Sequence, residues 1–138
     1  MELNLQLHEI IENLIHLSIA YLLALLMAFD RERSNHGAGL RTFPLVAVAS
    51  CGYALVAMSV LTTSEAEAKV LEGIITGIGF IGGGAILKNK NSTYGTATAA
   101  SIWNMGLIGI AVAFSRYEIA VLMAIINFIT LRYVKRLK

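Results

Sequence analysis

The chain is poor in charge and in cysteine. Only 14% of its 138 residues are charged, whereas 57% are hydrophobic. A soluble domain carries about 25% charged residues, so a water-soluble globular core is excluded. The single cysteine, Cys51, lies in an apolar run and has no second cysteine with which to form an intrachain disulfide. It is interpreted as a buried thiol and says nothing about the redox compartment.

Motifs for catalysis and cofactor binding are also missing. The chain has no Ser/His/Asp set with plausible spacing, no CxxC, no HExxH and no Walker loop, so an enzyme is not expected. Gly77, Gly79 and Gly82 match the dinucleotide pattern G-x-G-x-x-G, but that motif needs a preceding strand, and here it lies inside an apolar run. We expect no cofactor and no nucleic-acid partner, and the sequence leaves metal binding open.

Long apolar runs are what the sequence has in abundance. A helix needs about 20 apolar residues to cross roughly 30 Å of hydrocarbon. Five runs bounded by charges or turn formers approach that length, approximately 10–29, 43–62, 70–87, 97–114 and 119–134. Acidic residues precede the first run, so a cleaved signal peptide is not expected. The sequence predicts a single all-α membrane domain over residues 1–138, a bundle of about five transmembrane helices in the lipid bilayer.

The basic residues predict the orientation of this bundle. Nine of the 11 lysines and arginines fall on one side of the predicted spans, and only Lys69 and Arg116 fall on the other. Lysine and arginine are retained on the cytoplasmic side during insertion. The N-terminus is therefore expected outside the cytoplasm and the C-terminus inside.

Glycines dominate the third predicted span. They let helix backbones approach closely in a membrane, so we expect them to form helix-packing faces, either within the bundle or between protomers. Three successive glycines each lower helix propensity by about 1 kcal/mol, which predicts a kink or break at 82–84. A stretch of small residues opens the fourth span, so the third and fourth helices are expected to form the centre of the protein. The packing glycines are Gly73, Gly77, Gly79, Gly82, Gly83 and Gly84.

Three motifs carry a family resemblance. They are Ala-Gly-Leu-Arg-Thr at 38–42, Gly-Ile-Gly-Phe-Ile-Gly-Gly-Gly-Ala-Ile-Leu at 77–87, and Thr-Ala-Ala-Ser-Ile-Trp at 98–103. In this order and spacing the chain resembles the membrane domain of the MgtC/SapB family. Asp30-Arg31 stand where the family has Glu-Arg. Tyr94 replaces a usual arginine, and Asn104 replaces a cysteine of some virulence-associated members, which weakens the transfer of any member's particular role.

The resemblance implies a multi-pass protein of the bacterial inner membrane that helps adaptation to low magnesium, stress or a host. It also implies a short form without the cytoplasmic domain of many members. Some members resemble modulators of other membrane machines, so we expect a regulator of ion or phosphate homeostasis that acts on a partner such as ATP synthase or a transporter. A homodimer is expected. The alternative is a small transporter or channel for Mg²⁺, K⁺, H⁺ or phosphate that uses a broken third helix.

The richest polar cluster is predicted at the cytoplasmic ends of the first two spans. Its charges either pair with one another to fix a hairpin or, with two helix N-termini, form an anion or carboxylate site. We expect Asp30 to hold Arg41 so that the guanidinium joins the first two helices to the start of the fourth. The functional cluster comprises Asp30, Arg31, Glu32, Gly39, Arg41, Thr42, Thr98, Ser101 and Asn104.

A second polar group is predicted near the outer ends of the first and third spans. Glu12, Asn13, His16 and Glu72 could converge on one outer site for a metal or proton, or could simply be solvated at the interface. Asn104 and Asn127 lie within the last two spans, where hydrogen bonding between helices is the usual role and a permeation path the rarer one.

Overall fold

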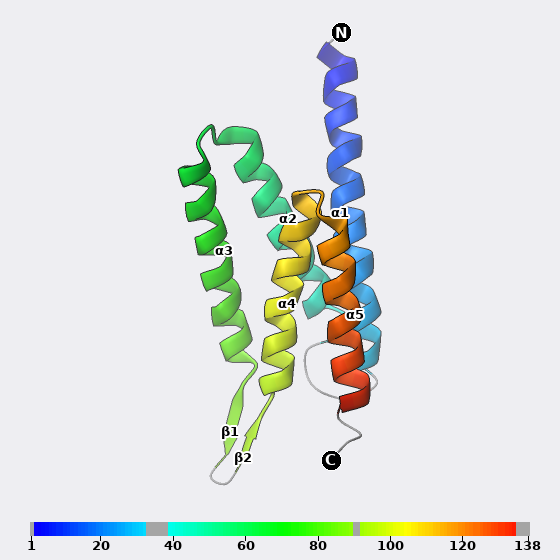
Figure 1. The fold of residues 1–138 in the computed structure, drawn as a ribbon, viewed down its shortest axis with the longest axis vertical. Helices are drawn as coiled ribbons and strands as arrows, with labels where there is room; N and C mark the ends of the chain where they lie inside the picture. The colour runs from blue at the N-terminus through cyan, green and yellow to red at the C-terminus, as the bar shows by residue number, and fades with distance from the viewer. Residues whose placement is uncertain (1, 33–38, 90–91, 135–138) are drawn as a thin grey trace.

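The computed structural model describes residues 2–32, 39–89 and 92–134. This part of the chain forms five helices and a short hairpin, whose arrangement can be followed in Figure 1. The elements are α1 (Glu2–Glu32), α2 (Thr42–Val60), α3 (Ser64–Gly84), β1 (Leu87–Asn89), β2 (Ser92–Tyr94), α4 (Thr96–Ala113) and α5 (Tyr117–Tyr133). Each predicted span falls on one of these helices in the predicted order, so the all-α bundle is confirmed.

Three of the helices are long and apolar enough to cross a membrane. They are α1 over Gln6–Phe29, α2 and α4. The first turns of α3 carry Glu65, Glu67, Lys69 and Glu72, and α5 has only 17 residues, or about 26 Å of helix. Membrane crossing by α3 and α5 remains a prediction. Following the predicted orientation, we call the end of the bundle that holds the N-terminus the outer end, and the opposite end the cytoplasmic end.

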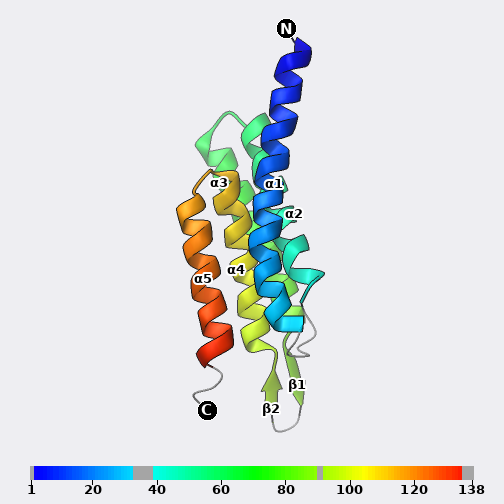
Figure 2. The same ribbon diagram turned by 90° about the vertical axis from the view of Figure 1, so that its right-hand side faces the viewer.

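Helix α4 lies in the middle of the bundle (Figures 1 and 2). It packs against each of the other four helices, most extensively against α2. Its fully buried side chains include Ile102, Met105, Ile108 and Val112. The sequence predicted that the third and fourth helices form the centre of the protein. This is correct for α4 and wrong for α3, which lies at the edge and packs mainly on α4 and α2.

Two glycines of α4, neither of which was singled out from the sequence, permit this close packing. A Cβ at Gly109 would collide with the backbone carbonyl oxygen of Ala47 in α2. A Cβ at Gly106 would collide with the side chain of Ile78 in α3. The missing side chain at Gly109 lets the backbones of α2 and α4 approach closely, whereas Gly106 makes room for the side chain of Ile78.

The glycines of α3 do not have the predicted role within the chain. Only Gly82 approaches another helix, because a Cβ there would lie 3.1 Å from the carbonyl oxygen of Ala99. At the other five a Cβ would meet no atom of the described residues within 4 Å, so their predicted packing inside the bundle is wrong. Packing between two copies remains a prediction for Gly73, Gly77, Gly79, Gly83 and Gly84.

The predicted break at 82–84 takes the form of a helix end. Helix α3 is continuous up to Gly84, and the backbone N–H groups of Ala85 and Ile86 close its last turn on Gly82 and Gly83 at 3.0 and 3.1 Å. The predicted third span ended at Leu87, but that residue lies in β1, which pairs with β2 in an antiparallel hairpin. Gly95 follows the hairpin with φ of 85°, and a Cβ there would collide with the carbonyl oxygen of Ala85.

Candidate functional site

The predicted cytoplasmic cluster is only partly within the described structure. Asp30, Arg31 and Glu32 form the end of α1, and their side chains lie outside what the structure describes. Gly39 is buried, and its carbonyl oxygen accepts a hydrogen bond from the backbone N–H of Phe43 at 3.1 Å. This bond fixes the entry into α2. The pairing of Asp30 with Arg41 therefore remains a prediction.

Arg41 and Thr42 open α2 at the cytoplasmic end. Arg41 is the N-cap residue, its side chain makes no capping hydrogen bond, and it is exposed. Thr42 is half-buried. An exposed guanidinium beside a helix N-terminus is a favourable environment for an anionic group, as the sequence predicted for this end.

Ser101, Thr98 and Asn127 place polar atoms inside the cytoplasmic half of the bundle. Their side chains are 1%, 2% and 4% exposed, respectively. The Ser101 hydroxyl donates to the carbonyl oxygen of Ala97 at 2.7 Å and lies 3.3 Å from Asn127 Oδ1. Two buried atoms have no hydrogen-bond partner in the described structure, Thr98 Oγ1 and Asn127 Nδ2. Asn104 is half-buried on α4.

The amide of Asn127 fits its surroundings better if its oxygen and nitrogen are exchanged. Ser101 has one hydroxyl hydrogen, and the shorter bond to Ala97 uses it. A rotated amide would point Nδ2 at Ser101 Oγ, which can accept, and the placement of O and N in an amide follows from such networks. Ser101 and Asn127 then join α4 to α5, as was predicted for an asparagine within a span.

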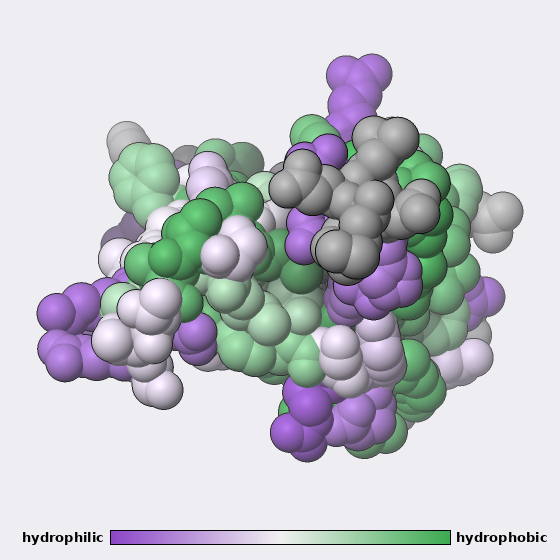
Figure 3. Space-filling model, turned by 90° about the horizontal axis from the view of Figure 1, so that it is seen from above, coloured by the Kyte–Doolittle hydropathy of each residue, from purple (hydrophilic) through white to green (hydrophobic). Residues whose placement is uncertain are grey.

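The predicted outer set is not brought together as one site. Glu12, Asn13 and His16 lie on α1, whereas Glu72 lies on α3, and α2 and α4 separate these two helices (Figure 1). Seen from the outer end, hydrophilic residues form separate groups with hydrophobic ones between them (Figure 3). Within the described ranges, no three His, Cys, Asp or Glu residues gather closely enough to hold a metal ion. The prediction that these four residues converge on one outer site is therefore wrong.

His16 instead contacts the turn between α4 and α5. Its Nδ1 donates to the carbonyl oxygen of Glu12 at 2.8 Å, so Nε2 is the acceptor in the neutral ring. The hydroxyl of Tyr117 lies 3.1 Å from Nε2 and that of Ser115 lies 3.3 Å from it. The rings of His16 and Tyr117 also stack at 6.0 Å between centroids. These contacts fasten α1 to the turn.

This contact was missed because its two sides are 101 residues apart in sequence. No signal in the sequence linked Tyr117 to His16. Beside it, Arg116 donates to the carboxylate of Glu118 at 2.6 Å, and this bond lowers the pKa of Glu118. The Glu12 carboxylate also lies 3.0 Å from Nε2 of the exposed His8, one turn away on α1. The outer end is thus held by short-range pairs and by the contact of His16 with Tyr117.

The five helices, three of them long and apolar enough to cross a membrane, define a small helical membrane protein. The model of the MgtC family matches residues 17–138. The chain belongs to the MgtC family. The resemblance of the three sequence motifs is thereby confirmed.

Several curated proteins are similar to this chain. The Synechocystis protein slr0014 is 33% identical over 125 residues, which cover 88% of this chain and 53% of that protein. The Escherichia coli K12 protein named "Putative magnesium transporter YhiD" is 28% identical over 87% of this chain and 59% of its own length. MgtC of Brucella abortus is 36% identical over 66% of this chain and 38% of its own length. The chain spans about half the length of these relatives. No solved structure matches it.

Proposed function

We propose that this chain is a regulatory membrane protein that modulates magnesium or phosphate homeostasis by binding another membrane complex. Family membership and the names of the relatives support a magnesium-related membrane protein. The finer role rests on one observation, which is the apolar packing of the interior. We place the protein in the bacterial inner membrane with N-out/C-in topology.

The interior offers little that could coordinate a permeating ion. In the part of the chain that the structure describes, the buried polar side chains are those of Ser50, Thr98, Ser101 and Asn127, and none is charged. The centre of α4 is filled by Met105, Ile108 and Val112. A charge within a bilayer is costly unless it is paired or hydrated, and this interior provides neither along the axis of a single chain. A binding role is therefore favoured over conduction.

The partner class follows from the same reasoning. A protein with apolar helix surfaces acts most directly on another membrane-embedded complex, such as ATP synthase or a transporter, and as a homodimer it would present two equal surfaces. Purified protein in liposomes tests this proposal. We expect no protein-dependent flux of Mg²⁺, K⁺, H⁺ or phosphate, together with a membrane complex that crosslinks to the chain in cells. Protein-dependent flux would overturn it.

Transport is the second candidate, and one observation favours it. Thr98 Oγ1 and one polar atom of the Asn127 amide are buried without a partner among the described residues, and unsatisfied polar atoms within a membrane bundle can line a path. The name of the relative YhiD points the same way. If flux is found in liposomes, Asn127→Leu should abolish it, whereas Tyr53→Phe on the exposed side of α2 should leave it unchanged.

A further inference from the structure

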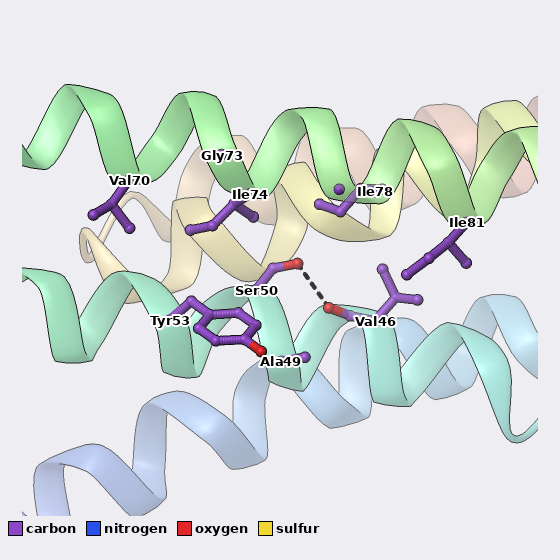
Figure 4. A pocket seen from close by; sticks show the side chains of 10 residues that line it. Val46, Ala49, Ser50, Tyr53, Val70, Gly73, Ile74, Ile78 and Ile81 are labelled. Carbon is purple, nitrogen blue, oxygen red and sulfur yellow. Dashed lines mark hydrogen bonds between the residues drawn. The ribbon is translucent and has the colours of Figure 1, made fainter.

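A groove runs between α2 and α3 on the outside of the bundle. Its volume is about 530 Å³, and its walls are apolar side chains from both helices. Figure 4 shows these side chains pointing toward one another across the space, with Tyr53 and Val70 at one end and Val46 and Ile81 at the other. Val70 and Ile81 are 11 residues apart, so the groove extends roughly 16 Å along α3. It lies parallel to the predicted membrane normal.

Two glycines keep the groove open. Gly73 and Gly77 lie one turn apart on α3 and line it. A Cβ at either residue would meet no described atom within 4 Å, so neither glycine is required for packing in the chain. Larger side chains at these two places would fill the groove and leave the fold unchanged.

The groove has few polar groups with which to hold an ion or a peptide backbone. The hydroxyl of Ser50 is one of few polar groups at the wall, and it donates to the carbonyl oxygen of Val46 at 2.8 Å (Figure 4). A volume of about 530 Å³ spread over roughly 16 Å corresponds to a cross-section of about 33 Å², whereas a helix with its side chains, about 10–12 Å wide, has roughly 80 Å² or more. A volume near 530 Å³ is in the range of sites for single small ligands. An extended hydrocarbon chain fits these dimensions.

The helices that form the groove carry positive charge at its cytoplasmic end. Arg41 precedes Val46 by five residues at the start of α2, and Lys88 follows Ile81 by seven residues in β1. Both side chains are exposed. A basic residue at a membrane surface strengthens the binding of an anionic headgroup about fivefold. At the end near Tyr53 and Val70, the basic residue Lys69 pairs with Glu65 at 3.3 Å. The charge therefore complements a phosphate at the cytoplasmic end of the groove.

We propose that the α2–α3 groove binds one acyl chain of an anionic phospholipid of the cytoplasmic leaflet, with its phosphate near Arg41 and Lys88. The acyl chain makes the apolar contact along Gly73 and Gly77, and the two basic residues of the protein select the headgroup. This site is independent of whether the protein regulates or transports. It assigns a role to glycines that do not pack against any helix of the described chain.

Native mass spectrometry of the full chain, released from detergent with phosphatidylglycerol or phosphatidylcholine, tests the groove. Gly77→Leu and Gly73→Leu should each lower phosphatidylglycerol binding at least fivefold. Gly79→Leu is the matched control, because Gly79 is on the same helix, has equal free space and does not line the groove. It should change binding less than twofold. Equal melting temperatures of the three variants would show that the fold is retained.

The headgroup is tested with Arg41→Gln and Lys88→Gln. Each should reduce the preference for phosphatidylglycerol over phosphatidylcholine about fivefold, whereas Lys69→Gln at the outer end should not. Inorganic phosphate alone should neither bind nor compete. Unchanged lipid binding in both groove variants, an equal loss in Gly79→Leu, or no preference between the two lipids would overturn the proposal. The proposal would also be overturned if the wild type were a dimer and Gly77→Leu were a lipid-free monomer. The groove would then be occupied by a second copy of the protein and not by a lipid.

Discussion

The hydroxyl of Tyr117, in the first turn of α5, donates a hydrogen bond to Nε2 of His16 in α1 at 3.1 Å. The direction follows from Nδ1, which is committed as a donor to the carbonyl oxygen of Glu12. The bond joins two helices that are distant in sequence, next to Ser115, whose φ of 55° is in the left-handed region. The contact therefore braces a strained turn against α1.

Tyr117→Phe removes this bond and keeps the ring stacked on His16. We expect the free energy of unfolding to fall by about 1 kcal/mol, the usual net value of one hydrogen bond. Denaturant unfolding in detergent measures the change. Tyr53→Phe is the control, since Tyr53 is 65% exposed and should show no loss. Equal stability of Tyr117→Phe and the wild type would contradict a bracing role.

Among the glycines within the described helices, Gly109 is the one at which a Cβ would come closest to the backbone of another helix. A methyl group there collides with the backbone of α2 at Ala47, so Gly109→Ala should force α2 and α4 apart. Overpacking of this kind costs about 1–3 kcal/mol. Gly83→Ala, on the open side of α3, should leave the melting temperature unchanged or raise it. If Gly109→Ala melts at the same temperature as Gly83→Ala, the close approach of α2 and α4 is refuted.

The five helices could be predicted from the sequence because apolar run length is a local property. The packing role of each glycine could not be predicted from the sequence, because it depends on which face of the helix is turned toward a neighbouring helix. Gly79 and Gly109 are both glycines within apolar runs, yet one faces open space and the other faces the backbone of α2. The contact between His16 and Tyr117 was hidden for a similar reason, since only the fold brings α1 beside the α4–α5 turn. Hairpin β1–β2 was missed because the apolar run continues past Gly84 into Leu87.

The link between Ser101 and Asn127 leads to a third prediction. Ser101→Ala would strand a buried amide, and an unsatisfied buried polar group costs about 1–3 kcal/mol. Replacing both residues, as Ser101→Ala with Asn127→Leu, should cost less than the sum of the single changes because no polar atom is then stranded. A double-mutant cycle on unfolding free energies measures this difference. Strict additivity would show that the two side chains do not interact.

The orientation of the bundle is the fourth prediction. Nine of 11 basic residues lie on the predicted cytoplasmic side, so alkaline phosphatase fused after Lys138 should be inactive. The same enzyme fused after Thr63, in the loop before α3, should be active because this loop is predicted to lie outside. Activity at Lys138, or inactivity at Thr63, would contradict the five-span N-out/C-in arrangement.

The pairing of Asp30 with Arg41 is the last prediction. Breaking a buried pair costs about 3–5 kcal/mol, whereas a solvated pair is worth about 1 kcal/mol or less. Because Arg41 is exposed in the described structure, we expect a coupling near the lower value. Asp30→Asn, Arg41→Gln and the double variant, compared by unfolding and by growth in low magnesium, isolate that coupling.

The ion pair of Glu65 and Lys69 provides the matched control for this cycle. Its atoms lie 3.3 Å apart and its side chains are 83% and 73% exposed, so Glu65→Gln with Lys69→Gln calibrates a fully solvated pair. If the coupling free energy of Asp30 and Arg41 is equal to or larger than that of Glu65 and Lys69, the two residues pair and join α1 to α2. If the effects of Asp30→Asn and Arg41→Gln simply add, the two residues do not pair. Arg41 is then free for a phosphate or a partner carboxylate, and growth in low magnesium should depend on Arg41 but not on Asp30.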